Sequence, residues 1–161
     1  VINCPGSVAL CATMPAKGSS KYADEGTLLH NVIAEILTSD KPLLDYIGTT
    51  YADQVLTEEL LTDKLLPALS ALEETDPNHT MQFAVETSVH FGQLMPKVFG
   101  STDLIGRMGN KAIVLDWKFG NGLIVEAAEN EQLMFYAAAA MRTEATLWAF
   151  KDVTEIEGFR A

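Results

Sequence analysis

The spacing of apolar residues predicts two helical segments in the first half of the chain. Residues 20–38 carry apolar side chains at a helical period, namely at Leu28, Leu29, Val32, Ile33, Ile36 and Leu37. Ser19 or Ser20 is a suitable N-cap for this helix. Residues 51–74 repeat the helical period, and Pro67 predicts a bend or break there because proline has no backbone N–H to donate. The intervening residues 39–50 are predicted to form a loop.

The pattern changes from helical period to alternation at residue 82. Residues 82–91 alternate, with Phe83, Val85, Thr87, Val89 and Phe91 on one predicted face and Ala84, Glu86, Ser88 and His90 on the other. Residues 98–109 and 111–118 are two further predicted strands, and the turn between them indicates a hairpin. We therefore expect three consecutive strands that pair with each other.

The last quarter of the chain completes the predicted domain. Residues 127–142 are rich in alanine and predict a helix, and residues 144–150 read as a fourth strand. The order is helix, helix, three strands, helix, strand. This order predicts an α/β or α+β domain in which helices flank a mixed sheet.

Composition and charge narrow the class of protein. The 161 residues are 48% hydrophobic and 20% charged, which suits one globular domain with a sizeable core. The net charge of −11 argues against non-specific binding of polyanions, although a local basic groove or a metal site among carboxylates remains compatible with it. No apolar run approaches the ~20 residues that span a bilayer, so we expect no membrane association.

Two cysteines, Cys4 and Cys11, are too few for a four-thiolate zinc or iron–sulfur site. Their spacing permits a disulfide, but reduced thiols that pack in an intracellular protein are the better interpretation. No iron–sulfur cluster is therefore expected.

The third predicted strand ends in charged residues. Asp116 and Lys118 share a face by the period of a strand and lie ~7 Å apart along it. A carboxylate can hold a divalent cation, and a neighbouring ammonium can stabilise a phosphate or position a water, a combination suited to metal-assisted phosphodiester hydrolysis. Taken alone, the pair is more often an ordinary salt-bridged strand end.

Other polar residues in the chain strengthen the case for a functional role of Asp116 and Lys118. Asp103 lies opposite the third strand if the hairpin forms, and Gly100 before it permits close backbone approach. His30 falls in the first turns of the first helix, while Gln132 and Tyr136 share one helix face at a spacing of i, i+4. Taken singly, His30 is more often a structural helix histidine, and Gln132 with Tyr136 is more often a half-buried helix surface.

In order along the chain, these motifs resemble the signature of the RecB-like branch of the PD-(D/E)XK nucleases. The segments that carry the resemblance are Cys4-Pro5-Gly6-Ser7, Glu25-Gly26-Thr27 followed by His30, Gly100 to Asp103, Asp116 to Gly122, and Asn130 to Ala137. They are most similar to phage- and prophage-associated exonuclease-like proteins, and the likeness spans residues 3 to about 137. Phe119 stands where relatives commonly carry Tyr, and Ser101 intrudes in the "GT.D" motif.

The resemblance implies a fold and a set of roles. It implies a restriction-endonuclease-like core, with a helical segment inserted between the first helix and the first strand. Asp103, Asp116 and Lys118 would be catalytic, and His30, Asp103 and Asp116 would bind Mg²⁺ or Mn²⁺. Gln132 and Tyr136 would contact DNA, and Glu86 would be a further metal ligand or a group behind one.

The resemblance also implies an activity and partners. The chain would be a metal-dependent DNA exonuclease of a phage or prophage, acting in the cytoplasm of the bacterial host on ends of single- or double-stranded DNA. A recombination protein can be its partner, and oligomers are compatible with it. Residues 1–161 would form one nuclease domain that lacks a C-terminal portion present in relatives.

Two other functions are compatible with the sequence. One is a catalytically weak or inactive subunit that binds DNA ends or protein in a recombination or packaging complex. The other is an acidic interaction protein, such as a DNA mimic, which would spread its carboxylates over the surface. The set His30, Asp103, Asp116 and Lys118 favours the nuclease, because a pure binding protein needs no such set.

Overall fold

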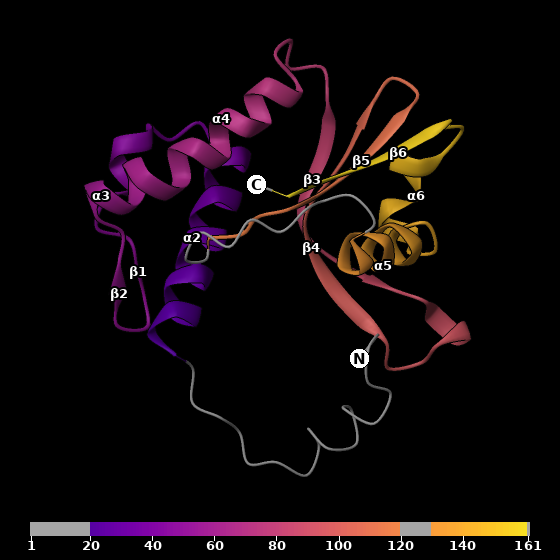
Figure 1. Cartoon of the computed structure of the whole chain (residues 1–161), viewed down its shortest axis with the longest axis horizontal. Coiled ribbons are helices and arrows are strands. Elements are labelled where there is room, and N and C mark those ends of the chain that lie inside the picture. Colours follow the sequence, from indigo (N-terminus) through magenta and orange to yellow (C-terminus); the bar gives the residue numbers. More distant parts are fainter. Residues whose placement is uncertain (1–19, 120–129, 161) are drawn as a thin grey trace.

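A four-stranded mixed sheet lies between two groups of helices in the computed structural model, which describes residues 20–119 and 130–160 (Figure 1). The sheet has the order β3-β4-β5-β6, and its strands are β3 (Gln82–His90), β4 (Phe99–Met108), β5 (Lys111–Asp116) and β6 (Glu155–Arg160). The first three strands are antiparallel neighbours, whereas β6 runs parallel to β5. The predicted mixed α/β class is therefore confirmed.

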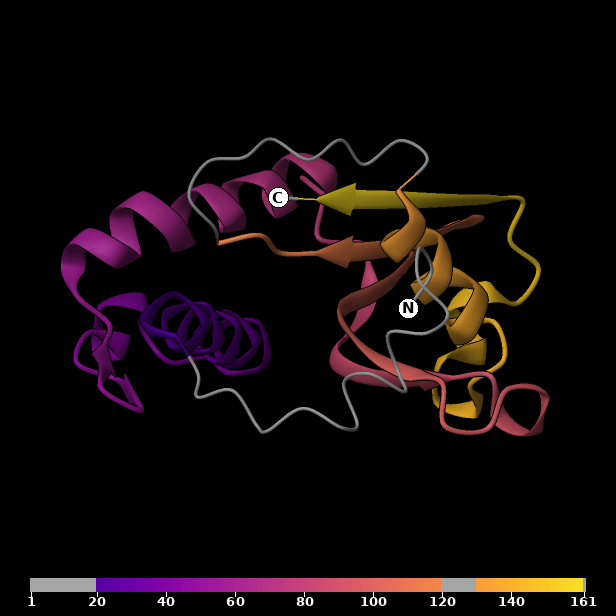
Figure 2. The same ribbon diagram turned by 60° about the horizontal axis from the view of Figure 1, so that its bottom comes forward.

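One face of the sheet is covered by the helices that precede it in the chain. These are α2 (Lys21–Thr38), the 3₁₀ turn η1 (Leu43–Tyr46), α3 (Glu58–Leu60), the π-helical turn η2 (Leu61–Leu65) and α4 (Leu66–Thr75). Their apolar side chains form the larger core with Leu104 and Leu115 of the sheet and with Trp117, which directly follows β5. Figure 2 shows α2 and α4 on this side of the strands.

The opposite face is covered by helices from the end of the chain. These are α5 (Glu131–Ala140), the 3₁₀ turn η4 (Glu144–Thr146) and α6 (Leu147–Phe150), with a further 3₁₀ turn, η3 (Gly92–Leu94), between β3 and β4. A smaller core joins Val89 and Ile105 of the sheet to Ala139, Ala140 and Ala149 of these helices. Small residues on α5 and α6 let the helices pack closely on the strands.

The first helix begins where the sequence predicted. Ser20 is the N-cap of α2, and its hydroxyl accepts a hydrogen bond from the amide of Ala23 at 3.2 Å. The predicted strands over 82–91, 98–109 and 111–118 correspond to β3, β4 and β5. Gly109, with φ of 61°, makes the predicted turn between β4 and β5.

The predicted helix over 51–74 is wrong at its start. A short hairpin, β1 (Thr50–Tyr51) and β2 (Gln54–Val55), precedes the helix, which begins after the N-cap Thr57. The expected disturbance near Pro67 takes the form of η2, since a π turn is one way to accommodate a missing amide donor. Residues 39–50 also contain η1 and are not wholly loop.

The predicted fourth strand over 144–150 is also wrong, because this segment forms η4 and α6 and the fourth strand is β6. Two carbonyl oxygens at the C-terminal end of α6 accept hydrogen bonds from a side chain of the sheet. Arg107 of β4 donates from Nη1 to the carbonyl oxygens of Trp148, at 3.2 Å, and Lys151. A short apolar run is compatible with helix or strand, and this tertiary hydrogen bonding stabilises the helix.

The single apolar face predicted for residues 82–91 is divided between the two cores. Val85 packs with the α2 side of the sheet, whereas Val89 and Phe91 pack with the α5 side. The alternation changes phase at Glu86, whose φ of 47° is outside the extended region.

No helix within residues 20–119 and 130–160 is both long and apolar enough to cross a membrane.

Candidate metal and phosphodiester site

Three carboxylates from three neighbouring strands stand in one row across the sheet. The pairing of β3 with β4 puts Glu86 opposite Asp103, between the recorded pairs Val85–Leu104 and Thr87–Thr102. One step beyond the last recorded pair of β4 with β5, Leu104–Leu115, Asp103 comes opposite Asp116. Neighbouring strands are ~4.8 Å apart. The row therefore brings together residues that are far apart in the chain.

His30 reaches this row from α2. A ligand nitrogen of His30 and one carboxylate oxygen each of Glu86 and Asp103 lie within 4.8 Å of one another. His30 lies in the middle of α2 rather than in its first turns, and its imidazole packs edge-on against the ring of Phe119, with centroids 5.1 Å apart. The cluster of His30, Glu86 and Asp103, called the triad below, has the donor set of a cation site.

The imidazole of His30 has an unsatisfied buried nitrogen. Nδ1 lies 3.3 Å from Oδ1 of Asp103, but it has no hydrogen-bond partner of suitable geometry. A buried polar atom without a partner carries a desolvation cost of about 1–3 kcal/mol. A cation between this nitrogen and the two carboxylates would remove that cost, so the residues present fit a metal ion.

Glu86 has an unusual backbone and an altered acidity. Its φ of 47° is strained for a side chain with a Cβ, and such strain is concentrated at functional sites. Burial of the carboxyl group against the strand raises the pKa of Glu86, and the nearby charge of Asp103 raises it further, while His30 acts in the opposite direction. The residue as a whole is still exposed to solvent.

Asp103 is held in place by the backbone that follows β5. The amide of Trp117 donates a hydrogen bond to Oδ2 of Asp103 at 2.5 Å. The Trp117 side chain is only 1% exposed and lies in the core on the α2 side. This residue thus positions a carboxylate of the triad through its amide. No signal in the sequence pointed to this role, because it is played by the backbone amide and not by the side chain.

Asp116 lies in a second group of polar side chains. It is 3% exposed, and Nζ of Lys118 lies 2.6 Å from its Oδ2. The side-chain amide of Gln132 donates to Oδ1 of Asp116 at 3.5 Å and to the hydroxyl of Tyr136 at 2.8 Å. Gln132 of α5 therefore lies beside Asp116, while its role stays a prediction.

Two local features bring α5 to this position. Asn130 caps the helix, because its side-chain oxygen accepts from the amides of Gln132 and Leu133 at 3.0 and 3.2 Å. Gly100 on β4 lets the ring of Tyr136 approach the strand, since a Cβ at that position would come within 2.9 Å of it. The expected close approach at Gly100 is thus made by a helix.

The seven predicted site residues fall into two adjoining groups. His30, Glu86 and Asp103 form the triad, and Asp116 contacts Lys118 and Gln132, which in turn contacts Tyr136. The expected metal set of His30, Asp103 and Asp116 differs from the triad, in which Glu86 takes the place of Asp116. Cys4, Cys11 and the turn over 120–122 lie outside the described residues.

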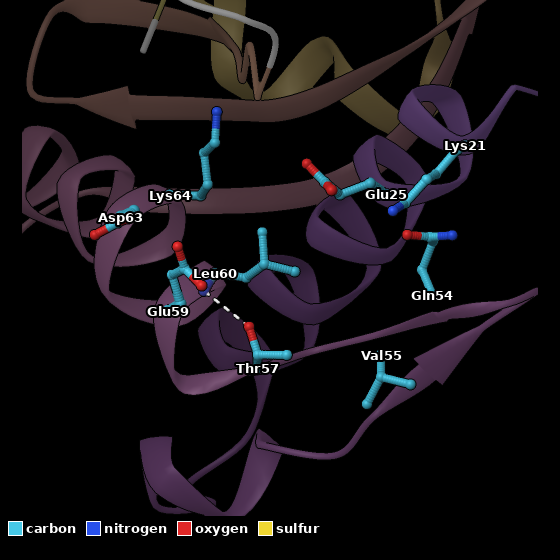
Figure 3. A pocket seen from close by; sticks show the side chains of 9 residues that line it. All are labelled: Lys21, Glu25, Gln54, Val55, Thr57, Glu59, Leu60, Asp63 and Lys64. Carbon is cyan, nitrogen blue, oxygen red and sulfur yellow. Dashed lines mark hydrogen bonds between the residues drawn. The ribbon is translucent and has the colours of Figure 1, made fainter.

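A separate pocket of about 360 Å³ lies between α2, the β1–β2 hairpin and α3 (Figure 3). It contains none of the seven predicted site residues. Lys21 and Lys64 line it together with Glu25, Glu59 and Asp63, so it shows no clear preference for an anion or a cation.

A comparison with protein families places the whole described site within one family. A family model described as "Protein of unknown function (DUF2800)" matches residues 2–156, a range that includes all seven predicted site residues. Because the match covers nearly the entire chain, this protein belongs to the DUF2800 family.

Proposed function

We propose that this protein is a divalent-metal-dependent deoxyribonuclease that hydrolyses phosphodiester bonds beside the row of Glu86, Asp103 and Asp116. The observation that carries the proposal is the convergence of the triad, with its unsatisfied His30 nitrogen, on a strand end that also presents Lys118. The resemblance to RecB-like nucleases adds that it is a phage or prophage exonuclease, working on DNA ends in the bacterial cytoplasm.

The triad would hold the metal ion. His30 would supply Nδ1, and Glu86 and Asp103 would each supply a carboxylate oxygen. Two carboxylates suit Mg²⁺ or Mn²⁺, and the imidazole makes the set more favourable for Mn²⁺. When bound, such an ion supplies Lewis-acid polarisation of a phosphoryl oxygen and lowers the pKa of a coordinated water.

The protein side chains around Asp116 would act on the substrate. Lys118 has a side chain that is 40% exposed, so its ammonium can reach a phosphate while it stays next to Asp116. There it would stabilise the negative charge that develops on the phosphoryl oxygens and position the attacking water. Gln132 and Tyr136 would hydrogen-bond the scissile strand and keep Asp116 in place.

The test is cleavage of end-labelled linear and circular DNA by the full-length protein, with and without Mn²⁺. We expect digestion of the linear DNA that depends on Mn²⁺. Substitution Lys118→Ala should lower the rate by roughly a hundredfold or more, the usual loss for one well-placed electrostatic group. Mn²⁺ affinity, measured by calorimetry, should stay within about tenfold, because the triad does not include Lys118.

Lys111→Ala is the matched control. Lys111 begins β5, and it also pairs with carboxylates, at 3.6 Å from Oε1 of Glu155 and closer still to Glu157. It lies at the opposite end of the strand from the row, so its loss should leave cleavage unchanged. Equal cleavage by the Lys118→Ala and wild-type proteins would contradict the catalytic role of Lys118.

One observation favours a second candidate, a subunit that binds DNA ends or protein without cutting. Lys118 lies 2.6 Å from Asp116 and neutralises it, which is also what a purely structural lysine would do. A wild-type protein that binds Mn²⁺ and DNA, but cuts no nucleic acid, would establish this candidate in place of the nuclease.

A further inference from the structure

We infer that the outer half of the β3–β4 hairpin binds one unpaired strand of the DNA substrate, and that Phe99 is the positioning residue on which a base stacks. This inference rests on the proposed function, because a DNA strand bound along the hairpin would lead to the triad.

The hairpin presents one exposed face that leads away from the triad. The recorded pairs Ser88–Ser101 and His90–Phe99 follow Glu86 and Asp103 in turn along the two strands. All four of these residues are exposed. Phe99 is four residue steps along the strand from Asp103, which is roughly 13 Å. The face is therefore continuous with the proposed site.

The other face of the same hairpin is fixed against α5. Val89 packs in the smaller core with Ala139 and Ala140, and its partner Gly100 lies directly under the ring of Tyr136. The amide of His90 donates to Oγ1 of Thr143 at 2.9 Å. Contacts on one face hold the strands, so the exposed face is a preformed surface.

Phe99 is the most prominent feature of this face. Its side chain is 73% exposed, more than any other large apolar side chain among the described residues. Leu94, at 65%, and Met95, at 46%, add exposed apolar surface at the hairpin tip. Exposed aromatic rings stack well on nucleic-acid bases, whose faces are open in a single strand and covered in a duplex.

Charge distinguishes the hairpin from the rest of the molecule. The chain carries 22 acidic residues and a net charge of −11, which repels a polyanion from most surfaces. Residues 87–102 contain no Asp or Glu but include Lys97, and no other stretch within residues 20–119 and 130–160 runs as long without an acidic residue. The hairpin between Glu86 and Asp103 therefore contributes no carboxylate that would repel a DNA strand.

The test measures binding without cleavage. A fluorescein-labelled oligothymidylate and a blunt duplex are titrated with full-length wild-type, Phe99→Ala, Phe99→Leu and Phe99→Tyr proteins in EDTA. We expect Phe99→Ala and Phe99→Leu to weaken single-strand binding about 5- to 100-fold, the range for loss of one base–aromatic stack. Phe99→Tyr should bind like wild type. Fluorescence of 2-aminopurine placed in the oligonucleotide should be quenched by wild type and not by Phe99→Ala.

Leu44→Ala is the matched control, because Leu44 is 68% exposed but lies on η1, away from the hairpin. It should leave binding unchanged. Unchanged melting temperatures for the Phe99 variants would show that they fold.

Wild-type affinity in Phe99→Ala or Phe99→Leu would overturn the inference, and so would an equal loss of duplex binding. Continued Mn²⁺-dependent cleavage in that case would leave the proposed function intact. Wild-type protein that neither binds nor cuts DNA would instead overturn the proposed function and this inference together.

Discussion

Gly100→Ala tests how closely α5 approaches the sheet beside the candidate site. A Cβ at position 100 would lie 2.9 Å from Cε1 of Tyr136 and 3.2 Å from Cε1 of Phe135. Ordinary carbon contacts are 3.5–4.0 Å, so two rigid rings would have to move by several tenths of an ångström. The substitution therefore overpacks the contact between β4 and α5.

The expected change in the free energy of unfolding is the balance of two effects. Overpacking of a close contact costs about 1–3 kcal/mol. Replacement of glycine by alanine also restricts the unfolded chain, which stabilises the fold by about 0.4–1 kcal/mol. The net destabilisation is then about 0–2.6 kcal/mol, or a fall in melting temperature of up to roughly 10 °C for a chain of this size.

Gly26→Ala is the matched control for the same chemical change. Gly26 lies within α2, and no atom would come within 4 Å of an added Cβ. Alanine is a better helix former than glycine, so this variant should be stabilised by about 0.5–1 kcal/mol. Both variants are compared with wild type by thermal and urea unfolding. A melting temperature raised equally by both substitutions would refute the close contact of α5 with β4.

Two further predictions concern stability. Asp76 is buried, and burial alone would raise its pKa, but hydrogen bonds from Thr80 and from the amide of Met81 outweigh this and lower the pKa. Its contribution should be complete above pH ~4, the unfolded value, and lost as pH falls through the lower folded pKa. In urea unfolding at pH 7, Asp76→Ala should lose about 1–3 kcal/mol, and most of the difference from wild type should vanish in acid. Thr143→Val removes the hydroxyl that accepts a hydrogen bond from the amide of His90. In the same assay the free energy of unfolding should fall by about 1–2 kcal/mol at any pH. For either variant, an unchanged free energy of unfolding at pH 7 would contradict the prediction.

The sequence alone was sufficient where local chemistry decides the structure. The periodic apolar residues and the Ser20 cap predicted α2, and alternation predicted β3 to β5 with their turn at Gly109. The hairpin between β4 and β5 also put Asp103 beside the end of the third predicted strand, because antiparallel register follows from a short turn and Leu104 pairs with Leu115.

Short segments whose pattern fits more than one structure depended on tertiary contacts. Residues 144–150 have a composition suited to a strand, but they form a helix end where Arg107 donates to the carbonyl oxygen of Trp148. Residues 51–55 continue a helical pattern, yet they pair as β1 and β2. Local propensity differs by less than the energy of a few hydrogen bonds, so long-range partners decide such cases.

The membership of the candidate site divides in the same way. The residue types and spacings of His30, Asp116 and Gln132 were legible in the chain, because each lies on a regular element whose face can be predicted, and Lys118 follows the end of β5 by two residues. Glu86 was not assignable to the triad from alternation, since its left-handed backbone breaks that alternation. The separation of the triad from the pair of Asp116 and Lys118 depends on where α2 packs against the sheet, because α2 supplies His30, and only the tertiary structure decides that packing.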